Sequence, residues 1–537
     1  MAVTGNHPVI ALGIDAPNAD LLLAAMDDGD LPFLARMREQ GAIGTCTHTK
    51  LFRNESCWDV FLSGQSLQNP GSSFDAETYC YANLSVHQKL GSTPLFYSGY
   101  LSNHICVFDL PAPIARRLNG VQITGWGSEL NACAPMSQPE GLLAKLEAMH
   151  GLNPRFEDGL QSVIDPISGL AERSVPLPSL YVEQDLLRLK RQLLESIRRR
   201  TAICADLLQA DRWDLFLALY SECHTANHML WHLCHDHPLG PDSDKGSSTF
   251  GEIYREIDSS IAKLHALADR KASFVVYTID HTVSNRMDVP TMALLPELLY
   301  RWAFPGQQAI GSVFSAGSPL PSPRLDYAKH WKAEVWTTVA EAAKARIASP
   351  FEQEAEADPL SWNPANWYKN LWPRMRAFAL PSVSDGYVRL NVCGREAHGL
   401  INPAEFGHIL LELRNLLLGC VNPRTGRPLV HDALIMRDTP LQRPDVPPDL
   451  VVRWSESGPP ADALECEEFG RIGPLPFFRS GGHVMHGTEV SSLLLVLGPA
   501  IQPGTSLRSG RLEDVPATIL TLAGLPLDEN MDGESLI

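Results

Sequence analysis

Apolar runs that stop abruptly at polar side chains constrain the fold of this chain more than any other feature of its sequence. Four apolar runs occur, and the first three end at polar side chains: residues 8–15 (PVIALGID), 214–222 (DLFLALYSE), 272–280 (ASFVVYTID) and 491–501 (SSLLLVLGPAI). None alternates apolar with polar residues, as a half-exposed strand would. Helical patterns separate them, most clearly at 19–40 and 181–210. Buried strands that alternate with helices predict an α/β fold, with a mostly parallel sheet covered by helices on both faces.

The ends of three of these runs carry side chains that can do chemistry. Asp15, Glu222 and Asp280 each lie where a predicted strand ends, and His281 follows directly in the sequence TIDH. The carboxyl ends of parallel strands meet at one edge of a sheet, and such folds bind their ligands there. We therefore expect these side chains to share one site. The alternative is that Asp280 and His281 only complete the hydrogen bonds of a strand end.

The 537 residues exceed what one small core needs, so the chain forms either one large α/β domain with added segments or two domains. We assign residues 1–64, 181–290 and 481–537 to the α/β core. Residues 65–180, rich in Gly, Pro, Ser and Asn, are predicted to form an insertion or lid. Residues 291–480, with many prolines and a tryptophan-rich segment, are predicted to form an added lobe.

Charge and hydropathy exclude several kinds of partner. The formal net charge of −18 argues against nucleic acid, whose phosphates require a basic face. A small anion can still bind where local cations outweigh the overall field. No run approaches the ~20 apolar residues of a membrane span, and the N-terminus does not resemble a signal peptide. The 11 cysteines are scattered, which is typical of reduced thiols in a cytoplasmic protein.

The densest polar cluster follows the second apolar run, in SECHTANHMLWHLCHDHP. His224 and His228 are four residues apart, so on a helix both point the same way, as two ligands of one metal ion would. The alternative is a histidine-rich surface helix. His232, His235 and His237 are expected at the surface or behind the ligands.

A further candidate lies in GGHVMHG, just before the last apolar run. Gly481 and Gly482 permit a tight backbone path that could bring His483 into a cleft. His486 competes for the same role, and a loop histidine that faces solvent is the alternative for either.

The candidate ligands together number more than one tetrahedral zinc ion accepts. They are Asp15, His224, His228, Asp280, His281 and His483. Mixed carboxylate and imidazole ligands suit zinc first, with manganese as the alternative. Two such ions a few ångströms apart, clamping a phosphoryl-type group, would use all six ligands.

Several segments resemble the alkaline phosphatase superfamily, in the branch of type I phosphodiesterases/nucleotide pyrophosphatases and predicted phosphohydrolase/phosphomutases. The opening VIALGIDAPNADLLLAAMDDGDLPFLARMREQGAIGT is similar to that branch's start, ESCWDVFLSG to its WxxFxTG segment, and DHT to its DHG. GREAHGLINPAEF and the C-terminal LEDVPATILTLAGLPLDENMDGESL resemble two further signatures. The resemblance implies an alkaline-phosphatase-like core with a dinuclear metal centre.

Each candidate ligand acquires an expected role from this resemblance. Asp15, Asp280 and His281 match the family's second metal site, and His228 and His483 match the first. The remaining ligand of the first site is an aspartate in the family, whereas His224 stands at that position here. The exchange keeps a ligand but makes the site less negative by one charge.

The expected nucleophile departs from the family pattern. Counting ten residues back from Gly64 gives Asn54, where the family has Ser or Thr. An amide is a poor nucleophile, so Ser56 could act instead after a small shift of the loop, with Thr47 and Thr49 further away. Without a covalent nucleophile, water activated by the metal ions could attack directly and invert the configuration at phosphorus.

Basic residues near these motifs could bind the anion of the substrate. Lys50 and Arg53 precede Asn54, and Arg395 lies in the GRE segment. A solvated loop charge is the alternative for each of them. The sequence thus favours a cytoplasmic dimetal hydrolase or group-transfer enzyme for a phosphoester or related anionic metabolite. A metal-binding pseudoenzyme and a non-hydrolytic enzyme of specialised metabolism are the alternatives, and a homo-oligomer remains open.

Overall fold

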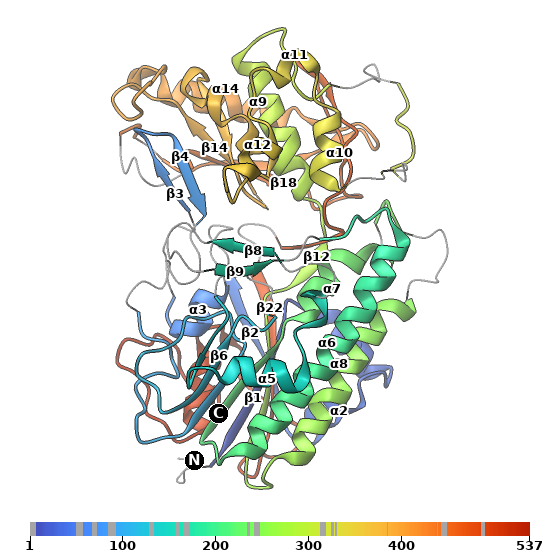
Figure 1. The fold of residues 1–537 in the computed structure, drawn as a ribbon. Coiled ribbons are helices and arrows are strands. Elements are labelled where there is room, and N and C mark those ends of the chain that lie inside the picture. The colour runs from blue at the N-terminus through green and yellow to red at the C-terminus, as the bar shows by residue number, and fades with distance from the viewer. Residues whose placement is uncertain are drawn as a thin grey trace.

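A computed structural model describes most of the chain (Figure 1). The described residues are 7–49, 57–66, 72–83, 93–127, 134–156, 161–164, 171–174, 177–233, 237–240, 247–311, 318–323, 327, 330–383, 385–437, 439–441, 448–484 and 489–537. Within these ranges, no helix combines the length and the apolar character needed to cross a membrane.

A ten-stranded sheet forms the centre of the larger part of the molecule. Its strands are β1 (Val9–Asp15), β2 (Ala42–Thr49), β5 (Ile105–Phe108), β6 (Gly120–Thr124), β7 (Met136–Gln138), β10 (Leu215–Tyr220), β11 (Ser273–Ile279), β22 (Glu489–Leu497), β23 (Thr505–Ser506) and β24 (Gly510–Arg511). Their order is β23-β2-β22-β11-β1-β10-β5-β6-β7, with β24 also paired to β2.

The sheet is mostly parallel, as predicted. β1 pairs in parallel with both β10 and β11, and β5 continues the parallel arrangement beyond β10. β22 differs from the expectation for the fourth apolar run, because it is antiparallel to its neighbours β11 and β2. Its apolar sequence reflects burial on both faces, which an antiparallel strand in the middle of a sheet shares with a parallel one.

Helices cover both faces of the sheet, which confirms the predicted fold class. They are α1 (Ala19–Asp27), α2 (Pro32–Gln40), α3 (Cys57–Ser63), α5 (Leu142–His150), α6 (Glu183–Ala210), α7 (Glu222–Leu230), α8 (Ser247–Leu267) and α15 (Asp514–Leu522). In β1, Ile10 and Leu12 face a core shared with α2, α6 and α8, whereas Val9 and Ala11 face a core shared with α3 and α15. Because side chains alternate between the two faces of a strand, β1 contributes to two separate cores.

The helical pattern predicted across residues 19–40 is two helices rather than one. α1 ends at Asp27 and α2 begins at Pro32. Gly29, between them, has a φ of +80°, a conformation that glycine adopts without strain. Pro32 then provides the fixed φ that suits the first position of a helix.

Part of the segment predicted as an insertion or lid belongs to the central sheet. Within residues 65–180, the strands β5, β6 and β7 extend the sheet beyond β10. The hairpin of β3 (Ser72–Asp75) and β4 (Cys80–Asn83) instead lies beside the second lobe (Figure 1), where the Tyr79 hydroxyl bonds to Asn391 Oδ1 at 2.8 Å. A second small hairpin pairs β8 (Gln161–Ile164) with β9 (Ala171–Ser174). The domain boundaries themselves stay a prediction.

The lobe built largely from residues 291–480 contains two four-stranded antiparallel sheets. One has the order β13 (Ala377–Leu380), β14 (Gly386–Leu390), β18 (Leu450–Trp454) and β17 (Val430–Ile435); the other has β16 (Arg427–Pro428), β15 (Val421–Asn422), β19 (Leu464–Cys466) and β20 (Gly470–Ile472). Its helices include α9 (Leu295–Ala303), α10 (Trp331–Thr337), α11 (Glu341–Lys344), α12 (Pro350–Ala355), α13 (Pro364–Trp367) and α14 (Phe406–Leu418). One continuous apolar core joins the lobe to the face of the central sheet that α2, α6 and α8 cover.

The carboxyl edge of the parallel strands faces this lobe (Figure 1). β12 (Thr282–Ser284) follows β11 at that edge and pairs with β21 (Gly481–His483). Because β22 is antiparallel to β11, its amino end lies at the same edge. The strand that returns from the lobe, β21, therefore lies beside β12 at the carboxyl edge of the sheet.

Candidate metal centre

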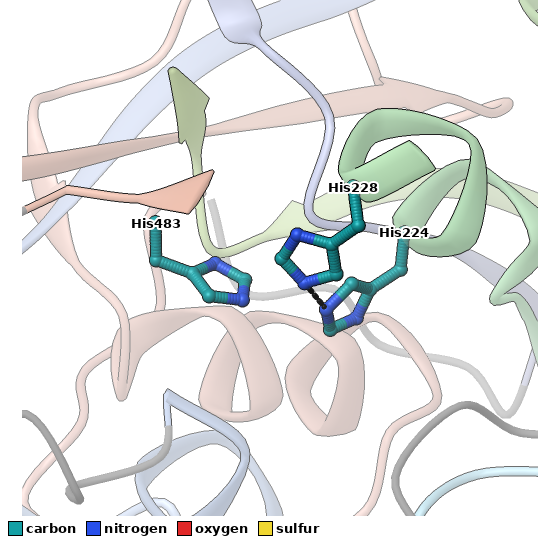
Figure 2. Close-up of side chains that lie close together, drawn as sticks. All are labelled: His224, His228 and His483. Carbon is teal, nitrogen blue, oxygen red and sulfur yellow. Dashed lines mark hydrogen bonds between the residues drawn. The ribbon is translucent and has the colours of Figure 1, made fainter. Parts of the chain in front are cut away.

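Helix α7 brings two histidines to this edge of the sheet. It begins directly after β10, and His224 and His228 project from the same side of the helix (Figure 2). Their Nε2 atoms lie 2.8 Å apart, and both side chains are buried. The alternative of a histidine-rich surface helix is therefore wrong for this pair.

The third histidine of the cluster comes from far along the chain. His483 ends β21, opposite Thr282 of β12, and its ring faces the other two (Figure 2). The centroid of the His483 ring lies 5.0 Å from that of His224 and 4.9 Å from that of His228, and its plane is nearly perpendicular to both. One ring nitrogen of each of the three histidines lies within 4.8 Å of the others.

Two glycines allow β21 to pass this close to α7. A Cβ on Gly481 would come within 2.1 Å of the Asn227 carbonyl oxygen, and a Cβ on Gly482 within 2.8 Å of the Asn285 side chain. Backbone cannot yield at the first position, so a side chain there would push β21 away from the helix. The tight backbone path predicted for these glycines is observed.

Two carboxylates from the strand ends extend the histidine cluster. Asp15 Oδ2 lies 2.9 Å from His224 Nδ1, and Asp280 Oδ2 lies 3.2 Å from His483 Nδ1. Asp280 has a φ of +66°, which ends the strand and redirects the backbone. Its Oδ1 accepts a hydrogen bond from the His281 amide at 2.7 Å, a local contact that helps aspartate adopt this conformation.

The donor chemistry of the cluster fits a divalent metal ion. His228 Nδ1 lies 2.8 Å from the Gly481 carbonyl oxygen, which can only accept, so Nδ1 holds the proton and Nε2 presents a lone pair. His224 Nε2 at 2.8 Å and Arg479 Nη1 at 3.2 Å both lie against that lone pair. An imidazole lone pair among further imidazoles and carboxylates is the ligand environment of zinc and related ions.

Burial shifts the protonation of two of these residues. Loss of hydration raises the pKa of the Asp15 carboxyl, although the charge of His224 opposes the shift. Loss of hydration also lowers the pKa of His228 well below its usual value, and the charges of Arg479, His224 and His483 lower it further. His228 is therefore neutral near pH 7, which is the form that ligates metals.

His281 lies next to this cluster, with its ring against the start of α1. Its Nε2 lies 3.2 Å from Asn18 Nδ2, and its Nδ1 accepts a hydrogen bond from the Ala19 amide at 3.4 Å. Asn18 Nδ2 also donates to the Thr282 carbonyl at 2.8 Å. The side chains of five of the six predicted ligands thus contact one another, whereas the ring of His281 contacts Asn18 and the Ala19 amide.

Among the described residues, Asn18 beside His281 was not found from the sequence, nor were Trp58, Arg479 and Asp288. Trp58 Nε1 donates to Asp15 Oδ1 at 3.2 Å. Arg479 contacts His228 and is itself held by Asp288, with Nε and Nη2 each 2.8 Å from a carboxylate oxygen. Arg479 could have been suspected, because it lies four residues before His483 in FRSGGH. Nothing in the sequence distinguishes Asp288 from other aspartates.

The predicted role of Arg395 in substrate binding is wrong. Its side chain is fully buried in the lobe, where Nη1 and Nη2 contact the Asp449 carboxylate at 2.7 and 2.6 Å. Nε lies 2.9 Å from Glu396 Oε1, and Nη2 also donates to the Leu390 carbonyl at 2.6 Å. All three guanidinium nitrogens of Arg395 are thus bonded within the protein. The GRE segment therefore stabilises the lobe.

Four other predicted site residues lie outside the described residues: Lys50, Arg53, Asn54 and Ser56. The same holds for His235 and His486. His232 and His237, expected at the surface or behind the ligands, are both buried. Burial lowers the pKa of His232 to about 4 and that of His237 well below its usual value.

Comparison with known proteins gives one local sequence match. No protein-family model matches the chain. A stretch of 57 residues is 49% identical to the 2,3-bisphosphoglycerate-independent phosphoglycerate mutase of Cereibacter sphaeroides and 47% identical to that of Ruegeria pomeroyi. The matched stretch is 11% of this chain and 11% of each mutase.

Solved structures resemble the chain over nearly its whole length, at low identity. Phosphonoacetate hydrolase from Sinorhizobium meliloti 1021, in complex with phosphonoformate, has a TM-score of 0.44 at 13% identity, covering 96% of both chains. Murine ectonucleotide pyrophosphatase/phosphodiesterase 5, in complex with AMP, has a TM-score of 0.44 at 10% identity, covering 97% of this chain and 96% of that one.

Proposed function

We propose that this protein is a hydrolase or group-transfer enzyme that uses two divalent metal ions to act on a phosphoester or related anionic metabolite. The observation that carries this proposal is the cluster of His224, His228 and His483, whose ligating nitrogens lie within 4.8 Å of one another. Contacts from His224 to Asp15 and from His483 to Asp280 add carboxylates to the imidazoles. Zinc suits this mixture, and manganese is the alternative.

The ligands divide into two sets in this proposal. The first set is His224, His228 and His483, and the second is Asp15, Asp280 and His281. Two divalent ions held there would polarise the substrate's phosphoryl group and stabilise the negative charge that develops on its oxygens.

Neighbouring residues orient these ligands. The Gly481 carbonyl fixes the ring of His228 through Nδ1. The Trp58 indole donates to Asp15, and the Asn18 side-chain nitrogen contacts the ring of His281. Outer contacts of this kind set the direction and basicity of metal ligands.

Either Ser56 or a water molecule supplies the attacking oxygen in this proposal. Asn54 and Ser56 belong to the segment between β2, which ends at the carboxyl edge of the sheet, and α3, whose Trp58 contacts Asp15. Both ends of this segment therefore support a role for it at the site. Attack by Ser56 predicts retention of configuration at phosphorus, whereas direct attack by water predicts inversion.

A second candidate function is a metal-binding pseudoenzyme that captures an anionic ligand. The observation that favours it is Asn54, an amide at the position where the resembled family has its nucleophile. A non-hydrolytic enzyme of specialised metabolism that uses the same metal pair is a further form of the proposal. In either case we propose a small anionic metabolite as the partner, and a cytoplasmic location, which the absence of disulfides among the described cysteines supports.

One set of measurements tests these functions. Metal content is measured together with hydrolysis of p-nitrophenyl phosphate and bis-p-nitrophenyl phosphate, for the wild type, His228→Ala and Asn54→Thr. We expect two metal ions per chain and turnover that is lost in His228→Ala. Activity gained only in Asn54→Thr would instead support the pseudoenzyme, and a protein that binds no transition metal would contradict both functions. In ¹⁸O-labelled water, a hydrolytic product carries the label and a non-hydrolytic product does not.

A further inference from the structure

Arg479 places a guanidinium group at the edge of the histidine cluster. Its Nη1 lies 3.2 Å from His228 Nε2, the nitrogen that presents a lone pair. The residue precedes β21, and its side chain is 12% exposed, so the guanidinium is mostly shielded from water. Hydrogen bonds from a charged donor are stronger in such surroundings than in bulk water.

Asp288 holds this guanidinium in one orientation. Arg479 Nε lies 2.8 Å from Asp288 Oδ2, and Nη2 lies 2.8 Å from Oδ1, a bidentate pair. Asp288 is fixed in turn by Asn285, whose Nδ2 donates to Oδ2 at 2.7 Å. Two of the three guanidinium nitrogens are thus committed to Asp288, and the third, Nη1, is directed at the cluster.

A second arginine shows what a purely structural pair of this kind does with its third nitrogen. Arg424 contacts Asp462 through Nε at 2.7 Å and Nη2 at 2.5 Å, which is the same bidentate arrangement. Its Nη1 donates to the Pro321 carbonyl at 2.8 Å and so completes the bonding within the protein. Arg479 Nη1 instead meets an imidazole nitrogen that the proposed function assigns to a metal ion. When that lone pair is used by a metal, the N–H groups of Nη1 are left for an anion.

We propose that Arg479 binds a non-bridging oxygen of the substrate's phosphoryl-type group, and that it favours doubly charged groups, such as phosphate monoesters and phosphonates, over singly charged diesters. The inference deepens the proposed function and rests on it. A guanidinium fixed in direction makes charge-assisted hydrogen bonds whose strength grows with the charge on the acceptor oxygen. The group that carries more charge therefore gains more from Arg479.

The test measures anion binding separately from turnover. Inorganic phosphate is titrated calorimetrically into the zinc-loaded full chain, for the wild type, Arg479→Met and the matched control Arg424→Met. Metal content is measured on the same samples. We expect the Kd for phosphate to rise at least about tenfold in Arg479→Met with two metals retained, and to stay within about twofold in Arg424→Met. Phosphate binding of wild-type affinity in a fully metal-loaded Arg479→Met would overturn the proposal.

Substrate preference gives the second readout. In Arg479→Met, kcat/KM for p-nitrophenyl phosphate is expected to fall more than kcat/KM for bis-p-nitrophenyl phosphate. Equal losses on both substrates would refute the preference for doubly charged groups. If Arg479→Met loses its metals, Arg479→Lys takes its place, because it keeps the charge but lacks the bidentate fork. Weaker phosphate binding with both metals retained is then expected, and unchanged affinity would reject the assignment.

The outcome separates this inference from the function on which it rests. A wild type that hydrolyses neither ester, but whose phosphate affinity depends on Arg479, would contradict the hydrolase and leave the anion subsite standing. A wild type that turns over esters with no contribution from Arg479 would support the hydrolase and contradict the anion subsite.

Discussion

Two buried clusters of polar side chains, one at the carboxyl edge of the sheet and one in the lobe, show how burial alone fails to identify a functional site. In the lobe, Arg395 and Arg389 face Glu396 and Asp449, with side chains fully buried. Backbone amides complete the bonding, as the Leu390 amide does on Asp449 Oδ2 at 2.7 Å. Every charge in that cluster has an opposite charge beside it.

The histidine cluster is arranged differently. The Nε2 atoms of His224 and His228 face each other, and Arg479 Nη1 also lies against Nε2 of His228. The first contact joins two imidazoles and the second joins a guanidinium to a neutral imidazole, so neither is an ion pair. We therefore interpret the lobe cluster as a support of the fold and the histidine cluster as a site for a ligand, and the following variants test this comparison.

The largest effect is expected from His228→Ala. Removing one imidazole leaves the first ligand set incomplete, so we expect loss of one metal ion per chain and a fall in kcat/KM of more than about 100-fold. Metal analysis and ester hydrolysis measure the two losses. The exposed His408 on α14 provides the control, and His408→Ala should keep both metals. Full metal content in His228→Ala would show that the histidine cluster is not the ligand set.

Arg395→Met should give the opposite pattern. Its removal leaves the buried Asp449 and Glu396 without their partner, so we expect the free energy of unfolding to fall by about 3–5 kcal/mol, with metal content unchanged. Urea denaturation measures the change. Arg414→Met, which breaks the partly exposed pair with Asp432, should cost less than about 1 kcal/mol. If Arg395→Met lost its metals while remaining folded, the separation of the two clusters would fail.

His232 gives a pH-dependent effect of intermediate size. Because burial lowers its pKa from 6.5 to about 4, the unfolded chain takes up a proton between these values that the native ring does not. Stability is therefore unaffected above about pH 6.5 and falls as the pH drops toward 4, by at most about 3 kcal/mol. Urea denaturation at pH 7 and pH 5 should show a smaller difference for His232→Phe than for the wild type. Identical differences would mean that the ring titrates normally in the native state.

The smallest effect is expected from Trp58→Phe, which removes the indole hydrogen bond to Asp15 but keeps an aromatic ring. We expect metal affinity or kcat/KM to fall about tenfold, as for other partners of metal ligands. The matched control is Trp454→Phe in the lobe, where the indole donates to Thr291 Oγ1 at 2.6 Å. That variant should lose stability without a change in metal affinity, and equal metal affinities in the two variants would count against a role for Trp58.

Much of the fold followed from the sequence because burial leaves a clear signal in it. The runs that became β1, β10 and β11 are apolar on both faces, and their polar ends marked the edge at which the site lies. The direction of β22 carried no such signal, since a strand buried on both faces has the same composition in either direction. The break between α1 and α2 was available from Gly29 and Pro32.

Site residues that follow strand ends could be predicted from the sequence. The roles of side chains that depend on ion pairs with residues distant in the sequence could not. His224, His228 and His483 come together as expected. Arg395 and Arg479 illustrate the limit, because each is an arginine beside a candidate motif. Their roles differ only because Asp449 and Glu396 surround the first, whereas Asp288 holds the second toward the histidines. Such partners are distant in sequence and leave no local pattern.

Because β21 comes late in the sequence, the residues of the site are translated in two stages. Asp15, Asp280 and His281 have all been translated once β12 is made, together with both histidines of α7. His483 follows only after the whole lobe. A nascent chain at that stage carries the complete second ligand set but lacks one histidine of the first. The lobe is therefore synthesised before His483, the last residue of the proposed first ligand set, which lies on the strand that follows the lobe.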